Sequence, residues 1–481
     1  MADRPKPEPS EERIQQQAEE ITRLRAEVER LERDHARLRR ENERLRKELD
    51  LARRAGYRQA APFSRGTPTR HPQRPGRKPG ALYGRQGRRP LPPVINQIYD
   101  VPLLATCPDC GGVVDDTHTT AQYQVDVPPV QPVVRRFEVH IGKCRQCGRR
   151  VQGRHPLQTS DALGAAAVQI GPAALATAAV LNKQVALSFG KIATFFAERF
   201  GLCLVPSTIV RALHRAATKA LPTYAALVQT VRSSPMVVMD ETGWRVHAEL
   251  QWLWAAVTPT TTVYAILPGR GFDEAACLLG PAFAGVLVRD GWAPYQQFTE
   301  AAHQTCLTHL GRRARELRTD YPRTVLPGQV EDVLHDALAV RDRYAAGTMS
   351  AQGVAIARGR LINRLSSLLG RSTTVAAVQR FVAHLNREWT ALFSFLFDLA
   401  IDATSYRAEH AIRWAVVTRK MCGGGNRTTR GAVTQFVLAS VLRTARQRGV
   451  DRHAIFVAML RAPTPIPLPV FQTRAAPPGP R

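Results

Sequence analysis

The chain has 481 residues and a formal net charge of +27, with 67 Lys and Arg against 40 Asp and Glu. It contains no apolar run of about eighteen residues, which excludes a typical membrane span, and its N-terminus has no secretory signal pattern. Its length allows roughly two to four domains, and eight cysteines in such a chain do not indicate a disulfide framework. We therefore expect a cytoplasmic protein whose clustered basic charge favours nucleic acid as a partner.

Residues 13–52 are predicted to form a coiled coil. Apolar residues recur every seven residues, with β-branched Ile21 and Val28 at a positions and leucines at d positions. This combination favours a parallel two-stranded coil, and Asn42 at an a position fixes register and a dimeric state. A single surface helix is the alternative, but the strict sevenfold spacing favours the coil and a homodimer. The d-position leucines are Leu24, Leu31, Leu38 and Leu45.

Residues 53–99 form a basic arm that is rich in Pro and Gly. From residue 51 to 99 the chain has eleven Lys and Arg and no acidic residue, and this composition cannot form a packed core. Such an arm can lie along DNA phosphates or in a minor groove; a solvated linker is an equally good interpretation. The candidate DNA contacts in this segment are Arg74, Arg77 and Lys78.

Two Cys-x-x-Cys pairs, each followed by glycine, lie within residues 100–156. Cys107 and Cys110 form the first pair, Cys144 and Cys147 form the second, and β-rich sequence separates them. Four thiolates at this spacing predict a zinc-binding ribbon with tetrahedral Zn²⁺. The site should be structural, because four protein ligands leave no open coordination position. A redox role fits less well, since no βαβ pattern surrounds either pair.

Residues 157–232 are rich in Ala and Leu and are predicted to be helical. The stretch FGLCLVPSTIVRALHRAATKAL, residues 200–221, reads as a turn followed by an amphipathic helix. This pattern is compatible with a helix-turn-helix that binds DNA through Arg211 and Arg215. Plain helical packing explains the same pattern and is the more frequent structure.

From residue 233 the pattern becomes strand-like. Three consecutive strands, a helix and a fourth strand are predicted, which together indicate an α/β core. The strands are PMVVMD (235–240), QWLWAAVT (251–258), TTVYAIL (261–267) and GVLVRD (285–290), with the helix at 272–280. The core is predicted to have two parts, 233–310 and 399–440, separated by a helical insertion at 311–398 and followed by a C-terminal helix and Pro-rich tail at 441–481.

The first and fourth predicted strands each end in an aspartate, Asp240 and Asp290. Taken singly, such an acid is often a turn residue or a helix N-cap. Two on neighbouring strands would repel each other, and one would be protonated unless a cation were present. Hard oxygen ligands of this kind suit Mg²⁺ (or Mn²⁺), and two such ions can clamp the oxygens of an in-line phosphoryl transfer.

A third carboxylate is needed, and Glu409 is the best candidate. It lies on a helix predicted to begin near Tyr406, although spacing alone does not favour it over Glu388 or Asp398. An ordinary surface pair between Glu409 and the residue four positions later is the simpler interpretation. The basic residues of this helix that are candidates for DNA binding are Arg413, Arg419 and Lys420.

These segments resemble the transposases of the IS66 family of bacterial insertion sequences. The similar motifs are DETGW at 240–244, PGRG at 268–271, VRDGWAPY at 288–295, HQTCLTHLGRR at 303–313, AEHAIR at 408–413 and RK at 419–420. The order of coil, basic arm, cysteine pairs, helical region and core is also similar. Each motif is short, so their joint order over about residues 15–435 is the specific feature.

The resemblance implies an RNase H-like catalytic core in a multidomain chain, with Asp240, Asp290 and Glu409 as catalytic residues that hold two Mg²⁺. Water would first cleave the phosphodiester at the end of the element. The freed 3′-hydroxyl would then attack target DNA in the same site. Such phosphoryl transfer needs mainly positioning and charge neutralisation. The implied partners are transposon-end and target DNA, a second copy of the chain and, in some systems, accessory transposition proteins.

The chain departs from the family pattern around the glutamate. Ser405 and Tyr406 stand where the family has two asparagines, His410 replaces an arginine and Trp414 replaces a proline. The alternative function is therefore a catalytically inactive zinc-ribbon and coiled-coil DNA-binding protein derived from a transposase. An RNase H-like nuclease would share the acids but not the order of parts.

His303, Cys306 and His309 form a His-x-x-Cys-x-x-His run after the second aspartate. The spacing of three predicts one helical face. A metal site is one interpretation. A structural or DNA-supporting role, as similar segments have in many RNase H-like transposases, is favoured because only three ligands are visible.

Overall fold

The computed structural model describes residues 9–56, 90–128, 130–164 and 168–462. The chain divides into two compact units, Met1–Pro102 and Leu103–Arg481. Most of the predicted basic arm, with Arg74, Arg77 and Lys78, and nearly all of the predicted tail lie outside the described residues. None of the helices in the described ranges is long and apolar enough to cross a bilayer.

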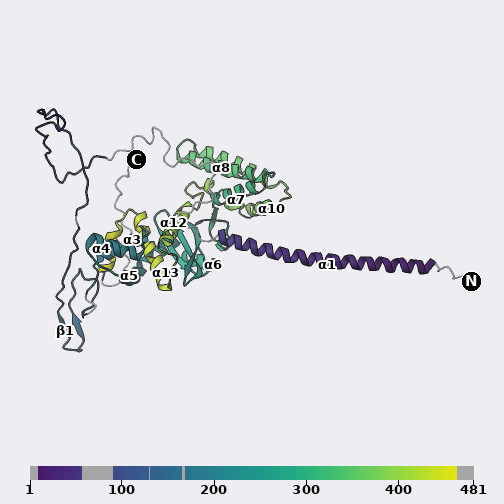
Figure 1. The fold of residues 1–481 in the computed structure, drawn as a ribbon, viewed down its shortest axis with the longest axis horizontal. Coiled ribbons are helices and arrows are strands. Elements are labelled where there is room, and N and C mark those ends of the chain that lie inside the picture. The colour runs from purple at the N-terminus through teal and green to yellow at the C-terminus, as the bar shows by residue number, and fades with distance from the viewer. Residues whose placement is uncertain (1–8, 57–89, 129, 165–167, 463–481) are drawn as a thin grey trace, which may run out of the picture. The chain divides into compact units, whose positions relative to one another are not determined.

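The first unit contains one continuous helix, α1 (Pro9–Gly56), which covers the whole predicted coiled-coil segment (Figure 1). Charged residues that favour helices dominate its sequence, and no Pro or Gly interrupts it before its end. The heptad side chains from Ile14 to Leu45 are about half exposed, from 50% to 66% of their surface. The helix therefore carries an uncovered apolar stripe at the predicted spacing.

The second unit begins with a small hairpin and three helices. Strands β1 (Ile141–Lys143) and β2 (Arg150–Gln152) pair antiparallel. The described residues between 115 and 140 form no regular strand, although their sequence is β-rich. The helices are α3 (Pro172–Lys183), α4 (Phe189–Phe200) and α5 (Pro206–Arg232), so the predicted turn at 201–205 does join two helices.

A five-stranded mixed sheet forms the centre of this unit. Its strand order is β5-β4-β3-β6-β7; the first three strands are antiparallel, whereas β6 and β7 run parallel to β3. Successive side chains of a strand point to opposite faces of the sheet, and buried residues on both sides show that both faces are covered. The strands are β3 (Met236–Val246), β4 (Glu249–Val257), β5 (Thr262–Leu267), β6 (Val286–Arg289) and β7 (Ala302–Thr305), with α6 (Phe272–Leu279) between β5 and β6 and the 3₁₀ turn η2 (Ala293–Gln297) after β6.

The prediction that a strand ends at Asp240 is wrong. Strand β3 continues six residues beyond it to Val246, because β4 pairs with it from Val238 to Val246, with Asp240 opposite Ala255. The parallel neighbour β6 does end at Arg289, just before Asp290. A fifth strand, β7, was not predicted, since it is short and carries few apolar residues.

The predicted helical insertion consists of packed helices, which Figure 1 shows in green. They are α7 (Leu307–Asp320), α8 (Leu326–Ala345), α9 (Ala351–Leu369), α10 (Ala376–Arg387), the 3₁₀ turn η3 (Trp389–Ala391) and the short α11 (Ser394–Phe397). The chain then forms α12 (Tyr406–Met421), α13 (Thr429–Gln447) and α14 (Arg452–Arg461). The predicted boundary at residue 440 falls inside α13.

Two apolar cores lie on opposite faces of the sheet. One contains Val238 and Leu253 together with residues of α7, α12 and the insertion. The other contains Val237 and Trp254 together with residues of α3, α5, α6, α13 and α14. Helix α12 is fixed to the sheet by the Tyr264 hydroxyl, which donates a hydrogen bond of 2.9 Å to the Ala411 carbonyl. Side chains at even positions of β3 thus face α7 and α12.

A glycine-rich turn joins α12 to the hairpin of β3 and β4. Asn426 donates its backbone N–H to the Arg245 carbonyl (2.8 Å), and its side-chain oxygen accepts the Trp244 indole N–H (2.9 Å). A Cβ on Gly425 would lie 1.8 Å from the Arg245 carbonyl oxygen, so only glycine fits there. The turn therefore fixes the end of α12 beside β3.

Candidate active site

Asp240 and Asp290 occupy matching positions on neighbouring parallel strands. The register of β3 and β6 pairs Val238 with Val288, and two further steps place Asp240 opposite Asp290. One oxygen of Asp240 accepts the Glu241 backbone N–H (3.0 Å), and one of Asp290 accepts the Trp292 backbone N–H (2.9 Å). Burial, followed by the negative charges of Glu241 and Asp290, raises the pKa of Asp240 to about 7.

Glu409 lies in the first turn of α12, and His309 of α7 lies between it and Asp240 in the charge network. The Glu409 carboxylate is 3.6 Å from the His309 ring nitrogen Nδ1. Both Glu409 and Asp240 act on the His309 charge and help to raise its pKa. His309 therefore interacts with both Asp240 and Glu409, and Asp290 lies beside Asp240.

Glu388 and Asp398, the competing acids, lie elsewhere. Glu388 is 1% exposed and is bound by Arg289, by the Thr305 hydroxyl (2.5 Å) and by Gln296 (2.9 Å). Burial opposes its ionisation, but the charge of Arg289 and these hydrogen bonds prevail and lower its pKa. Because Arg289 also donates to the Asp290 carbonyl (3.0 Å), this buried pair supports the loop that carries Asp290.

Cys306, His309 and Glu409 form a compact group in which one ligand atom from each lies within 4.8 Å of the others. Burial would raise the pKa of the Cys306 thiol, but His309 and Ser405 outweigh it and lower the pKa to about 7. The hydrogen bond with Cys306 raises the pKa of His309 to about 9 against the effect of burial. The group thus favours a thiolate beside an imidazolium, and its donor atoms could also hold a divalent cation.

The prediction that His303, Cys306 and His309 share a helical face is wrong. His303 lies on β7 and bonds to the Phe298 carbonyl (3.0 Å), whereas Cys306 is the N-cap of α7 and His309 lies within that helix. Ser405 donates both its backbone N–H and its hydroxyl to the Cys306 sulfur, each at 3.2 Å. Cys306 therefore joins the start of α7 to the start of α12.

A second charged network, not predicted from the sequence, adjoins the two aspartates. The Glu241 side chain is 1% exposed, and it accepts hydrogen bonds from Arg270 (2.6 Å) and from the Tyr295 hydroxyl (2.5 Å). The Arg270 guanidinium lies between two tryptophan rings, Trp252 and Trp292, and 4.0 Å from Asp290. It thus places a positive charge beside the acids. Two features of the sequence could have indicated this network: the arginine of PGRG, which is Arg270, and Glu241, which directly follows Asp240.

The predicted DNA-binding residues divide into two groups. Arg211 and Arg215 are exposed on α5, and Arg413 and Lys420 are exposed on α12. Arg419 is half-buried: it donates to the Gly243 carbonyl, and its guanidinium lies 5.3 Å from the centre of the Trp244 ring. It is therefore partly engaged within the fold, and its contact with DNA stays a prediction.

The four predicted zinc ligands lie on two similar turns. Gly111 donates its N–H to the Cys107 carbonyl and Gly148 donates to the Cys144 carbonyl, both at 2.9 Å. Backbone N–H groups within each turn lower the pKa of the first cysteine. Among the described residues the two pairs do not form one four-sulfur group. Each turn alone nonetheless has both cysteines near one another at its tip.

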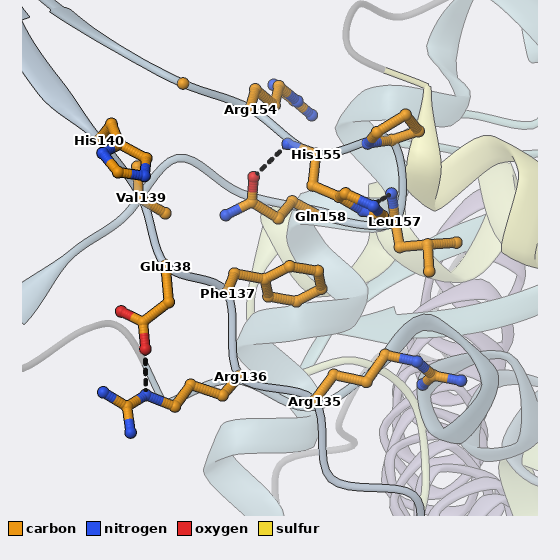
Figure 2. A pocket seen from close by; sticks show the side chains of 12 residues that line it. Arg135, Arg136, Phe137, Glu138, Val139, His140, Arg154, His155, Leu157 and Gln158 are labelled. Carbon is orange, nitrogen blue, oxygen red and sulfur yellow. Dashed lines mark hydrogen bonds and ion pairs between the residues drawn. The ribbon is translucent and has the colours of Figure 1, made fainter.

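An open cleft of about 590 Å³ is lined by the residues that flank β1 and β2 in sequence (Figure 2). Phe137 and His155 face each other there, with ring centroids 5.5 Å apart. Arg136 pairs with Glu138 and Arg154 pairs with Asp161, whereas Arg135 has no ion-pair partner in the described part of the chain. The cleft is thus basic and partly aromatic, and it shares no residue with the acidic site.

Comparison with known families identifies the class of protein. Residues 167–434, more than half of the chain, match the family model described as Transposase IS66 family. The chain therefore belongs to the IS66 transposase family. A search of curated proteins gave no match.

Proposed function

We propose that the protein is an active DNA transposase that cleaves and joins DNA strands through Asp240, Asp290 and Glu409. The observation that carries this proposal is the arrangement of the three acids: Asp240 of β3 lies opposite Asp290, just after β6, and both Asp240 and Glu409 interact with His309. Such a concentration of negative charge is unfavourable without a cation. The family membership supports DNA as the substrate.

The donor set fits Mg²⁺ or Mn²⁺, which prefer carboxylate oxygens. Such ions, when bound, would neutralise charge on the reacting phosphate. Arg270 lies beside Asp290 and adds a fixed positive charge, while Glu241 and Tyr295 hold Arg270 in place. His309 orients Glu409 from the opposite side. The protein thereby supplies position and charge, which are the main requirements of phosphoryl transfer.

The catalytic core is proposed to be RNase H-like. Three antiparallel strands followed by two parallel strands, in the order β5-β4-β3-β6-β7, support this assignment. In this proposal residues 233–310 and 399–440 form the core, α13 completes it beyond residue 440, and residues 311–398 are an insertion. Residues 157–232 are the helical region, in which Arg211 and Arg215 contact DNA.

The N-terminal parts are proposed to assemble the protein and to grip DNA ends. Residues 13–52 would form a parallel dimeric coil, because the exposed stripe of α1 has the required sevenfold spacing. Residues 53–99 would contact phosphates. Residues 100–156 would bind structural Zn²⁺ once the two cysteine turns meet, and the basic cleft beside the hairpin would add a DNA contact.

The test is a strand-cleavage assay with DNA that carries the flanks of the gene, in Mg²⁺ or Mn²⁺. Asp290→Asn should abolish cutting at a discrete flank position while DNA binding survives. Asp332→Asn, an exposed acid on α8, is the matched control and should cut normally. Equal cutting by Asp290→Asn, or an equal loss of binding, would contradict the proposal. Binding without cutting by the unaltered protein would favour the inactive DNA-binding alternative or a missing accessory protein.

A further inference from the structure

Three aromatic rings form a row along the outer surface of α12. The Tyr406 and His410 rings are stacked, with centroids 5.8 Å apart and planes 13° from parallel. The His410 and Trp414 rings follow edge to face at 6.3 Å. The three positions are four residues apart, which places them on one side of an α-helix. Tyr406, at the end of the row, has 67% of its surface exposed.

Two arginines of α13 border the row. The Arg443 and Arg446 guanidiniums lie 5.8 and 5.1 Å from the Trp414 ring centre, and Arg443 is 3.0 Å from the His410 ring nitrogen Nδ1. The buried Trp414 indole N–H has no hydrogen-bond acceptor among the described residues. The surface therefore combines stacked rings and positive charge.

This row lies beside the proposed catalytic glutamate. Arg413 is four residues after Glu409 and three after His410, so it lies between the acid and the rings on the helix surface. Arg413 is exposed, and it has no ion-pair partner within the described ranges. A DNA strand that approaches Glu409 would thus meet a cation first and the aromatic row next.

We infer that Tyr406, His410 and Trp414, with Arg413, Arg443 and Arg446, form a binding surface for unpaired nucleobases of the DNA strand held in the active site. Exposed rings give bases a stacking platform, and neighbouring arginines neutralise the phosphates between them. Phosphate binding alone would need only the arginines and would not explain an exposed tyrosine stacked on histidine. This inference rests on the proposed transposase function.

The row also coincides with the departures from the family pattern. Tyr406, His410 and Trp414 stand where the family resemblance leads us to expect asparagine, arginine and proline. The three replacements are separated in sequence, but they lie together in space. A common surface therefore accounts for all three, and we expect it to be a property of this chain in particular.

The experiment compares two single-stranded oligonucleotides of about ten nucleotides, one of thymidines and one of abasic sites with the same phosphates. The full-length Asp290→Asn protein is used, so that no cleavage interferes. Phosphate contacts made elsewhere on the chain cancel in the ratio of the two affinities. Tyr406→Ala should lower this ratio by roughly five- to 150-fold, the range expected for loss of one stacked base.

Two control variants separate stacking from structure. Tyr406→Phe keeps the ring and should retain the affinity ratio. Tyr344→Ala removes another exposed tyrosine, near the end of α8, and should leave the ratio unchanged. An unchanged ratio in Tyr406→Ala, or an equal loss of affinity for both oligonucleotides, would overturn the inference. Because binding is measured, these outcomes do not depend on strand cleavage, which separately tests the proposed function.

Discussion

Asp240 and Asp290 face each other across neighbouring parallel strands although one is in the middle of its strand and the other follows the end of its strand. Strand β6 stops at Arg289, whereas β3 continues to Val246 along β4. The sheet edge at Asp290 thus exposes the middle of β3. This step in the sheet makes room for a third acid from a helix.

The first prediction concerns pH and divalent ions. The pKa of Asp240 is near 3.8 in the unfolded chain and about 7 in the folded protein. The folded state thus holds the proton more tightly, so this stabilising contribution is complete below pH 4 and is lost as the pH rises to 7. Without metal at pH 8, Asp240→Asn should therefore melt about 2 °C or more above the unaltered protein. At pH 4 the two proteins should melt at the same temperature.

Thermal melts with and without Mg²⁺ check this prediction. Mg²⁺ should raise the melting temperature of the unaltered protein at pH 8, and it should have little effect on Asp240→Asn. Asp332→Asn is again the control. A variant that melts lower than the unaltered protein at every pH would show that Asp240 has a structural role instead.

Glu388→Gln should be strongly destabilising. The substitution leaves Arg289, which is 2% exposed, as a buried charge without its partner. Removing one member of such a pair costs about 3–5 kcal/mol. Urea denaturation would measure the loss in the free energy of unfolding, and Glu300→Gln, an exposed acid, should change it little. A loss equal to that of the control would argue against support of the Asp290 loop by this pair.

Gly425→Ala should weaken the attachment of α12 to the β3–β4 hairpin. The added methyl would collide with the Arg245 carbonyl oxygen, so the backbone bonds of Asn426 must break or shift. We expect reduced stability and faster amide hydrogen exchange at the end of α12. Gly359→Ala in α9 meets no neighbour and should stabilise by about 0.5–1 kcal/mol. Equal effects of the two variants would refute the close-approach argument.

Leu31→Lys should abolish dimerisation. Leu31 lies in the exposed apolar stripe of α1, at a d position that a second copy would cover. Size-exclusion chromatography with light scattering should report a monomer for Leu31→Lys. The control, Ala26→Lys, adds the same charge at an outer position of the heptad and should remain dimeric. A monomeric unaltered protein would instead show that the stripe has no second copy as its partner.

Zinc content provides a separate prediction. The unaltered protein should contain about one zinc ion per chain, and Cys107→Ser or Cys144→Ser should each remove most of it, because four ligands share one ion. Cys277→Ser, which alters an exposed thiol outside the two turns, should keep the metal. Elemental analysis measures the stoichiometry. Retention of zinc after loss of either pair would argue for two independent sites.

The sequence predicted which segments form strands better than it predicted where the strands end. Apolar runs identified β3, β4, β5 and β6, since these strands are buried on both faces. They placed an end at Asp240 because an acid normally interrupts such a run, and only the pairing with β4 carries the strand further. Strand β7 was missed since its stability comes from β6 and from the Gln304 contacts with Leu392 and Phe395, which no local pattern reveals.

For the candidate site, too, local patterns could be predicted but contacts between distant residues could not. Asp240 and Asp290 followed from strand pattern and Glu409 from family resemblance, whereas the choice of Glu409 over Glu388 required the ion pair with Arg289. That pair joins residues far apart in the chain. Likewise, Arg419 looked free in sequence, but it packs on Trp244 of a distant strand. Contacts between residues far apart in the chain are therefore what sequence spacing could not reveal.

The insertion between Asp290 and Glu409 has a consequence for synthesis of the protein. The sheet and its two aspartates leave the ribosome well before α12, and helices α7 to α11 must be made in between. Domains tend to fold as they emerge, and contacts between distant segments form late. A newly made chain would thus pass through a stage with a folded sheet and only two of its three acids. Under the proposed function, an unfinished chain would therefore not cut DNA until α12 docks.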